Sequence, residues 1–403
     1  MTIGYVRPSV MGIEEQQILA VSKLALGDPS VIPMWYGESD IVTDPAIRNI
    51  ATASIEKGET FYTHKRGQPD FCAALSRYMS DLYDNDIGPE RISVTQSGMA
   101  GIMLVFQLIL EAGDNIVIVG PVWPNAQGAA RIVGAEPRPA TLKNDPATGW
   151  YLDLDDIRRQ CDDRTRAIFF NSPNNPTGWV MPADQIEELL AFARERNIWL
   201  VADDVYQRMV YEGRVAPSVA AIAKPDDPVI IVNSFSKSWA MTGWRLGWIT
   251  HPPELGDVFG NLIEHNYSCV PDFIQRAGQY AIENGEPAVA AMIDHCRRGR
   301  DICAQRLPSM PGVSGFQTPK ASFYGFFRIE GTRGRTLDVC QALVREAKVG
   351  IAPGSAFGPG AEDWYRLCFA QDAARLSDAF DRLDSGLETL LPRFAGGLQK
   401  AAD

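Results

Sequence analysis

The 403-residue sequence lacks the cysteine and histidine patterns of metal-binding and disulfide-rich proteins. Its 7 cysteines include no C-x-x-C pair, and an odd number cannot all pair within one chain. The 4 histidines show neither an H-E-x-x-H nor an H-x-H grouping. We therefore expect no metal site, and we expect the protein to reside in a reducing compartment.

Long apolar runs and a surplus of positive charge are also missing. No run approaches the ~18 residues needed to cross a bilayer, and the first residues, MTIGYVRPSVMGIEE, lack the apolar region of a signal peptide. Lys and Arg number 38 against 50 Asp and Glu, giving a net charge of −12. Such a charge disfavours non-specific binding to nucleic acid. We expect a cytoplasmic protein that binds neither membranes nor nucleic acid.

Short apolar runs alternate with amphipathic segments through the middle of the chain. Hydrophobic residues make up 45% and charged residues 22%, which is ordinary for a globular protein. The runs are apolar on both faces and rich in β-branched residues, which is typical of buried parallel strands. They are 115–119 (NIVIV), 167–170 (AIFF), 198–202 (IWLVA) and 229–232 (VIIV). Between them, the spacing predicts a helix over 183–196, so the fold class is α/β with a mostly parallel sheet.

The sequence pattern changes after about residue 285. Arg-rich helical patterns lead there to an alternating segment at 321–329, ASFYGFFRI. At roughly 150 residues per domain, the length predicts two or three domains. We expect an N-terminal arm that includes part of the small domain (1–45), a large cofactor-binding domain (46–290) and a small α+β C-terminal domain (291–403).

Loops that follow the predicted strands carry side chains suited to binding an anion. In an open α/β sheet, ligands bind beyond the carboxyl ends of the strands. Ser97-Gly98-Met99-Ala100 opens a helix whose free backbone N–H groups can bind an anion. Ser234, Ser236 and Arg245 add hydroxyls and a guanidinium suited to phosphate.

Three further side chains at strand ends complete a recognisable set. Asp203 offers a carboxylate for a cationic nitrogen, Trp123 offers a flat ring, and Lys237 offers an amine whose pKa burial and Arg245 can lower. Each feature alone has an ordinary explanation as a helix cap, a core aromatic or a surface lysine. Together they match pyridoxal 5′-phosphate, which needs an attachment lysine, a phosphate site, a stacking ring and a carboxylate beside its pyridine nitrogen.

The segment 234–247, SFSKSWAMTGWRLG, resembles the lysine signature of the fold-type I pyridoxal-phosphate enzymes, specifically the class I/II aminotransferases of the aspartate aminotransferase superfamily. The turn Asn175-Pro176-Thr177-Gly178 precedes it as in that family, and the similarity runs from about Trp35 to about Phe369. The resemblance implies a large domain with a mostly parallel seven-stranded sheet. It also implies an aminotransferase (EC 2.6.1.-) that moves an amino group between an L-α-amino acid and a 2-oxo acid.

The resemblance also assigns roles around the cofactor. Lys237 would bond to pyridoxal 5′-phosphate and carry the proton in catalysis, and Asp203 would pair with the pyridine nitrogen. Tyr206 and Asn175 would hydrogen-bond the 3′-oxygen of the ring. Trp123 would stack on the ring, and the phosphate would be held by Met99, Ala100, Ser234, Ser236 and Arg245.

Further roles concern the substrate and a second subunit. Phe61-Tyr62-Thr63, followed by Gly67, resembles the family segment whose tyrosine reaches the phosphate of the neighbouring subunit. Tyr62 thereby implies a homodimer with shared active sites. Arg366, in 364–370 (WYRLCFA), would pair with the substrate α-carboxylate, with Gly37 and Asn175 bordering the substrate.

The same residues also bear on other functions of this fold. The site can also serve β-elimination, so a C–S β-lyase similar to cystathionine β-lyase remains the alternative. A transcription regulator of this fold needs an additional helix-turn-helix domain, for which the residues before Trp35 leave no room. An inactive binding protein is disfavoured by the intact Lys237, Asp203 and Arg245. The residues do not identify the amino donor or the acceptor.

Overall fold

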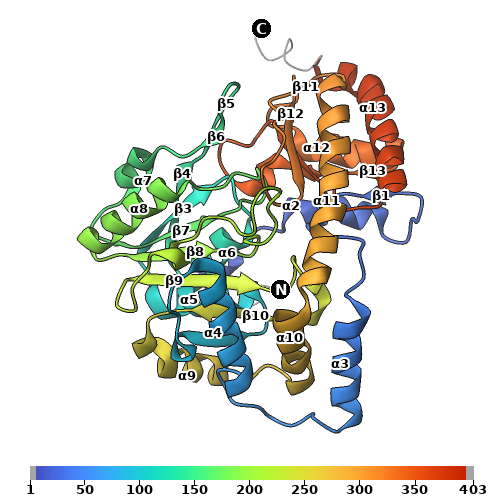
Figure 1. Cartoon of the computed structure of the whole chain (residues 1–403). Coiled ribbons are helices and arrows are strands. Elements are labelled where there is room, and N and C mark those ends of the chain that lie inside the picture. Colours follow the sequence, from blue (N-terminus) through green and yellow to red (C-terminus); the bar gives the residue numbers. More distant parts are fainter. Residues whose placement is uncertain (1–5, 396–403) are drawn as a thin grey trace.

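The computed structural model describes residues 6–395 and is built around one large sheet (Figure 1). Its seven strands lie in the order β2-β10-β9-β8-β7-β3-β4. Their bounds are β2 Ile92–Thr95, β10 Gly247–Thr250, β9 Val229–Ser234, β8 Trp199–Asp203, β7 Thr165–Asn171, β3 Asn115–Gly120 and β4 Glu136–Thr141. Only β10 runs antiparallel to its neighbours in this sheet. The predicted strands and the mostly parallel sheet are confirmed.

Helices cover both faces of this sheet, because successive side chains of each strand point to opposite faces. Val117 and Val119 of β3 pack into one core, and Ile116 and Ile118 pack into the other. The first core is closed by α3 (Pro45–Glu56), α4 (Pro69–Tyr83), α7 (Leu154–Gln160), α8 (Ala183–Arg196) and α10 (Asp272–Asn284). The second is closed by α5 (Gly98–Ile109), α6 (Asn125–Val133) and α9 (Gly256–Tyr267).

Helix α8 has the bounds that the sequence predicts. Pro182 precedes its first turn, and Asn197 ends it in a left-handed conformation with φ 50°. Arg194 in the last turn suits the negative end of the helix dipole and also donates to Asp227 at 2.6 Å.

A second, antiparallel sheet lies in the C-terminal part of the chain, in the order β11-β12-β15-β14. Its strands are β11 Val313–Ser314, β12 Tyr324–Ile329, β15 Trp364–Cys368 and β14 Ala352–Pro353. Figure 1 shows it close to α11 (Glu286–Arg306), α12 (Thr336–Ala342) and α13 (Ala373–Ala395). The alternating segment at 321–329 thus does contain a strand. However, β12 is buried on both faces: Gly325 on one face lies against Cys303 of α11, and Phe326 on the other packs against Trp150 and Phe357.

The N-terminal segment packs into the hydrophobic core of this C-terminal sheet. Ile18, Val31, Ile32 and Trp35 share one hydrophobic cluster with residues of the C-terminal sheet and helices. The short strand β1 (Ile32–Pro33) pairs in parallel with β13 (Val349–Gly350), and α1 (Pro8–Met11) and α2 (Gln17–Ser22) precede it. A hairpin of β5 (Lys143–Asp145) and β6 (Gly149–Tyr151) extends from the large sheet. The domain limits at 45 and 290 stay predictions, and the second falls inside α11.

None of the helices in residues 6–395 combines the length and the apolar character needed to span a bilayer.

Candidate active site

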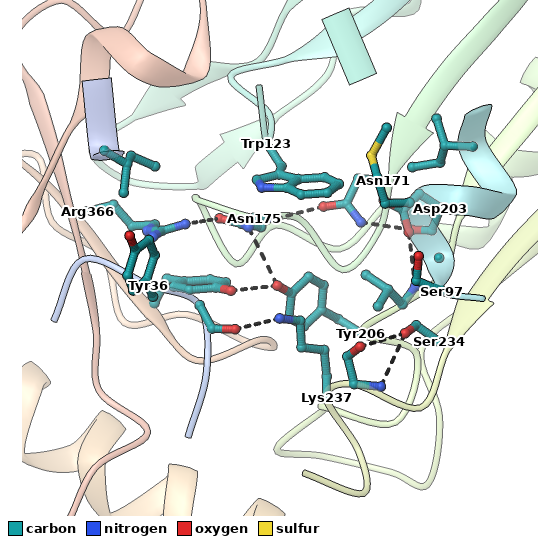
Figure 2. Close-up of a pocket in the computed structure, with 18 of the residues that line it drawn as sticks. Tyr36, Ser97, Trp123, Asn171, Asn175, Asp203, Tyr206, Ser234, Lys237 and Arg366 are labelled. Carbon is teal, nitrogen blue, oxygen red and sulfur yellow. Dashed lines mark hydrogen bonds between the residues drawn. The ribbon is translucent and has the colours of Figure 1, made fainter. Parts of the chain in front are cut away.

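A pocket opens at the carboxyl ends of the parallel strands, between the two sheets (Figure 2). Asp203 and Ser234 are the last residues of β8 and β9, and the pocket lies where such ends meet. The lining includes these predicted site residues: Gly37, Met99, Trp123, Asn175, Asp203, Tyr206, Ser234, Ser236, Lys237, Arg245 and Arg366. Ala100 lies next to the lining in the first turn of α5. Tyr62 lies elsewhere, with 88% of its surface exposed.

Lys237 places its amine inside this pocket. Its Nζ donates a hydrogen bond to the backbone carbonyl of Gly37 (Figure 2). Burial lowers the pKa of Lys237 to about 8, and nearby Arg366 adds to this effect. The amine is therefore partly uncharged near neutral pH, which is the form that attacks a carbonyl carbon and accepts a proton.

Asp203 places a buried carboxyl group at the other side of the pocket. It accepts one hydrogen bond, from the backbone N–H of Val205 at 3.3 Å, and Asn171 donates to its backbone carbonyl at 2.9 Å. Burial raises the pKa of Asp203 to about 7. Among the described residues it forms no salt bridge, and the charge of Lys237 only partly offsets the effect of burial on its pKa. A cationic ring nitrogen at this position would supply the missing charge.

The start of α5 and the end of β9 form a small polar cradle. The hydroxyl of Ser97 caps the helix by accepting from the N–H of Ala100 at 3.0 Å, and Ser234 and Ser236 join their hydroxyls at 2.9 Å. Gly247 lets the segments approach closely, since a Cβ there would lie 2.8 Å from the backbone nitrogen of Gly98. Helix N–H groups and hydroxyls at one point suit a phosphate.

Arg366 is the fixed cation at the opposite end of the pocket. Only 2% of it is exposed, yet its Nε has no hydrogen-bond partner among the described residues. Its guanidinium donates to Asn175 Oδ1 at 2.9 Å and to the carbonyl of Trp35. The rings of Tyr324 and Phe357 hold it on two sides, 4.6 and 4.8 Å from its central carbon. A rigid guanidinium with an unused N–H donor suits a carboxylate ligand.

The predicted turn that begins at Asn175 connects the Asp203 end of the pocket with the Arg366 end. The backbone N–H of Asn175 donates to Asn171 Oδ1 at 2.8 Å, and the carbonyl of Asn175 accepts from the N–H of Trp123 at 3.0 Å. Its side-chain amide lies 3.5 Å from the hydroxyl of Tyr206. Trp123 and Tyr206 are thereby placed along one pocket that runs from Asp203 to Arg366 (Figure 2).

Sequence reasoning missed part of the lining. The additional residues are Gln16, Ile18, Leu19, Tyr36, Ile102, Asn171, Val205 and Tyr324. Most belong to the N-terminal segment or to β12, neither of which ends at the carboxyl edge of the large sheet. Gly37, which the sequence did predict, borders one of them: a Cβ at this position would lie 2.1 Å from the hydroxyl of Tyr324 and would displace that ring. No group of three or more metal-ligating side chains occurs within residues 6–395.

Known proteins resemble the chain over almost its full length. A sequence model described as "Aminotransferase class I and II" matches residues 34–383. The aspartate aminotransferase of Pyrococcus horikoshii is 30% identical over 386 residues, which make up 95% of this chain and 97% of that protein. The aromatic-amino-acid aminotransferase 2 of Thermococcus litoralis is 30% identical over 381 residues, or 93% and 96%.

Solved structures agree with this result. The aspartate aminotransferase of Thermotoga maritima superposes with a TM-score of 0.87 at 27% identity, covering 95% of this chain and 100% of that one. The seven-stranded sheet expected from the lysine segment is present. The chain therefore belongs to the class I and II aminotransferases of the aspartate aminotransferase superfamily, with the type I fold of pyridoxal-phosphate enzymes.

Proposed function

We propose that this aminotransferase holds pyridoxal 5′-phosphate in the pocket and moves an amino group between an L-α-amino acid and a 2-oxo acid. The observation that carries the proposal is that the Lys237 amine and the unpaired Asp203 carboxylate lie in one pocket with the cradle at α5 and the Arg366 guanidinium. These groups match the aldehyde, the pyridine nitrogen and the phosphate of the cofactor, and the carboxylate of the substrate.

The residues that would hold the cofactor are those predicted from the sequence. Lys237 would attach it, Asp203 would pair with its nitrogen, and Tyr206 and Asn175 would hydrogen-bond its 3′-oxygen. Trp123 would lie against the ring, and the phosphate would be bound by Met99, Ala100, Ser234, Ser236 and Arg245. When bound, the cofactor supplies an electron sink for the bond that breaks at the substrate Cα.

The chain's own groups orient the substrate and move the proton. Arg366 would bind the α-carboxylate through two N–H donors, with Asn175 and the backbone of Gly37 bordering it. This contact fixes the Cα–H bond with respect to Lys237. With its pKa lowered to about 8, Lys237 Nζ can accept the Cα proton and give it back within one reaction cycle.

Two further parts of the proposal concern assembly and location. Phe61 and Tyr62 lie in the loop between α3 and α4, with 83% and 88% of their surfaces exposed. Exposed aromatic rings of this kind are common at interfaces, which supports a homodimer in which Tyr62 reaches the neighbouring site. The cysteine pattern supports the cytoplasm as the location.

Elimination chemistry has no separate support. The relatives described above are all named aminotransferases, and none of these observations favours the C–S β-lyase alternative. The two reactions differ in one measurable respect. An aminotransferase stops after one turnover unless a 2-oxo acid is supplied, whereas steady release of ammonia and pyruvate from cystathionine without an acceptor would establish the lyase.

The attachment of the cofactor at Lys237 is the direct test of the proposal. The protein would be loaded with pyridoxal 5′-phosphate, reduced with borohydride and mapped by peptide mass spectrometry. The label should lie on Lys237, and Lys237→Ala should lose both the label and nearly all turnover. Lys143→Ala is the matched control, because that side chain pairs with Asp153 outside the pocket. Retention of normal transamination by Lys237→Ala would overturn the proposal.

A further inference from the structure

The pocket contains few charged side chains, and the proposed function uses all of them. Of the described residues that line it, only Asp203, Lys237, Arg245 and Arg366 carry a charge. Under the proposed function, on which this inference rests, three of them bind the cofactor and Arg366 binds the substrate α-carboxylate. None of the lining residues that this chain contributes is then left to neutralise a second carboxylate on the substrate.

The wall near Arg366 consists of uncharged side chains. Figure 2 shows Tyr36 and Arg366 at one end of the pocket, with Asp203 and Ser97 at the other. Trp35, whose carbonyl accepts from Arg366, directly precedes Tyr36. Helix α2 contributes Ile18 and Leu19 to the same pocket. The group next to the α-carboxylate site therefore meets aliphatic and aromatic surface.

Helix α2 is held in place over the pocket at both of its ends. Gln16, just before it, donates from its side-chain amide to Asn125 at the start of α6. Ser22, at its last position, shares a hydrogen bond of 2.7 Å with the hydroxyl of Tyr36. In addition, Ser355 donates to the side chain of Gln17 at 2.5 Å. The apolar wall is thus a built part of the fold.

Three basic side chains that lie near α2 or near Tyr62 in the sequence have hydrogen-bond or salt-bridge partners outside the pocket. Lys23 pairs with Glu15. In the loop that carries Tyr62, Lys65 donates to Asn261 at 2.8 Å and Arg66 donates to the carbonyl of Ile92 at 2.8 Å. These contacts tie both side chains to their own large domain. Besides Tyr62, this loop leaves the ring of Phe61 and the imidazole of His64 exposed.

We infer that the side-chain part of this site takes apolar aliphatic or aromatic L-amino acids and rejects aspartate and glutamate. A second carboxylate placed against Ile18, Leu19 and Tyr36 would lose water without gaining a cation, which is costly. An apolar side chain in the same place is stabilised because its surface is removed from water. Leu19 is consequently a specificity residue, since its side chain lies both in the pocket and at its rim.

Single-turnover conversion of the loaded enzyme would measure this preference. We expect kcat/KM for leucine and phenylalanine to exceed that for aspartate and glutamate by about tenfold or more. Binding of two unreactive acids gives a readout that needs no turnover. The thermal shift and the dissociation constant should show 3-phenylpropanoate binding more tightly than succinate.

A cation placed at Leu19 should change the preference in a predictable direction. Leu19→Arg should raise the ratio of aspartate to leucine kcat/KM by about fivefold or more and should tighten succinate binding. Leu24→Arg is the matched control, because Leu24 is 39% exposed against 41% for Leu19 but does not line the pocket. That control should leave the ratio unchanged.

The outcomes separate this inference from the proposed function. Aspartate converted as fast as leucine and phenylalanine, together with succinate binding at least as tightly as 3-phenylpropanoate, would overturn the inference and leave aminotransfer intact. If no amino acid is converted, the proposed function fails, and the two unreactive acids still decide what the pocket accepts. An equal change of ratio in Leu19→Arg and Leu24→Arg would also count against the role of Leu19.

Discussion

The phenolic oxygens of Tyr206 and Tyr324 lie 2.5 Å apart and connect the loop after β8 to the first residue of β12. Burial raises the pKa of both hydroxyls above the ordinary value of 10. Both are therefore protonated at neutral pH, and one donates to the other. The ring of Tyr324 also lies against the Arg366 guanidinium. Tyr324 thus contacts both the proposed cofactor side and the proposed substrate side of the pocket.

Removing the Tyr324 hydroxyl should affect the cofactor through Tyr206. In Tyr324→Phe, Tyr206 keeps only the Asn175 amide, at 3.5 Å. We expect turnover to fall about tenfold, the size of one net hydrogen bond. The midpoint of the pH-dependent absorbance change of the bound cofactor should rise, because the 3′-oxygen anion is less well stabilised.

A second buried hydroxyl serves as the control for this prediction. Tyr211 donates to the carbonyl of Ser322 at 2.6 Å and does not line the pocket. Tyr211→Phe should cost similar stability and leave the absorbance midpoint in place. A midpoint that moves equally in both variants would remove the positioning role from Tyr324.

Asp203→Asn should stabilise the cofactor-free protein, and more so at high pH. Burial raises the pKa of Asp203 from 3.8 to about 7. Between these values the unfolded carboxyl has lost its proton and the folded one retains it. The unfolding free energy therefore falls as pH rises through this window and stays lowered above it. Thermal melts of cofactor-free protein should show a larger gain for the variant at pH 8 than at pH 5.

Asp227 gives the opposite case. Burial opposes ionisation there, but hydrogen bonds from Arg194 and from the Lys224 backbone prevail and lower the pKa of Asp227. Asp227→Asn should therefore destabilise the protein at pH 8.

In the presence of pyridoxal 5′-phosphate, Asp203→Asn should bind the cofactor loosely and turn over slowly. If Asp203→Asn changed the unfolding free energy of the cofactor-free protein equally at pH 5 and pH 8, this would contradict the raised pKa of Asp203.

Arg366→Lys should weaken binding of every α-amino acid and of the 2-oxo acid acceptor alike. Lysine cannot offer two parallel N–H groups to a carboxylate. We expect KM to rise by about tenfold or more, while the absorbance of the resting loaded enzyme stays nearly unchanged. Arg328→Lys is the control, because this side chain of β12 pairs with Asp363 away from the pocket. An effect restricted to one class of substrate would argue against binding of the α-carboxylate.

Subunit mixing should restore activity if the sites are shared. A Lys237→Ala chain should be inactive, and a Tyr62→Ala chain should retain little activity. After exchange, a heterodimer would contain one intact site, with Tyr62 from the first chain and Lys237 and Arg245 from the second. Partial recovery, followed by sedimentation and by turnover, is the expected result. A fully active monomer would contradict the arrangement.

The large sheet and most of the pocket could be predicted because one rule covers both. Runs such as NIVIV are buried on both faces, and the polar residues that follow them must gather at the carboxyl ends of parallel strands. Asp203 and Ser234 are such residues. Arg366 was found through its resemblance to a family motif, and its burial agrees with the apolar residues that follow it.

Tyr36 and Tyr324 could not be found in this way. Tyr324 lies in a segment whose alternation indicated only a strand, and its position depends on how the two sheets pack. Tyr36 and α2 belong to an N-terminal segment without a clear pattern, whose place is fixed by contacts with residues hundreds of positions away. Such tertiary contacts are not encoded in local periodicity.

The pairing of β1 with β13 has a consequence for the order in which parts of the protein fold during synthesis. Ile32 lies opposite Val349, so the strand before Gly37 has no partner until the ribosome has made most of the chain. The strands of the large sheet, in contrast, are complete by Thr250 and can associate earlier. Arg366 also emerges late. A nascent chain can thus assemble its cofactor cradle while its substrate wall is still missing, and closure of the site waits for these slow, long-range contacts.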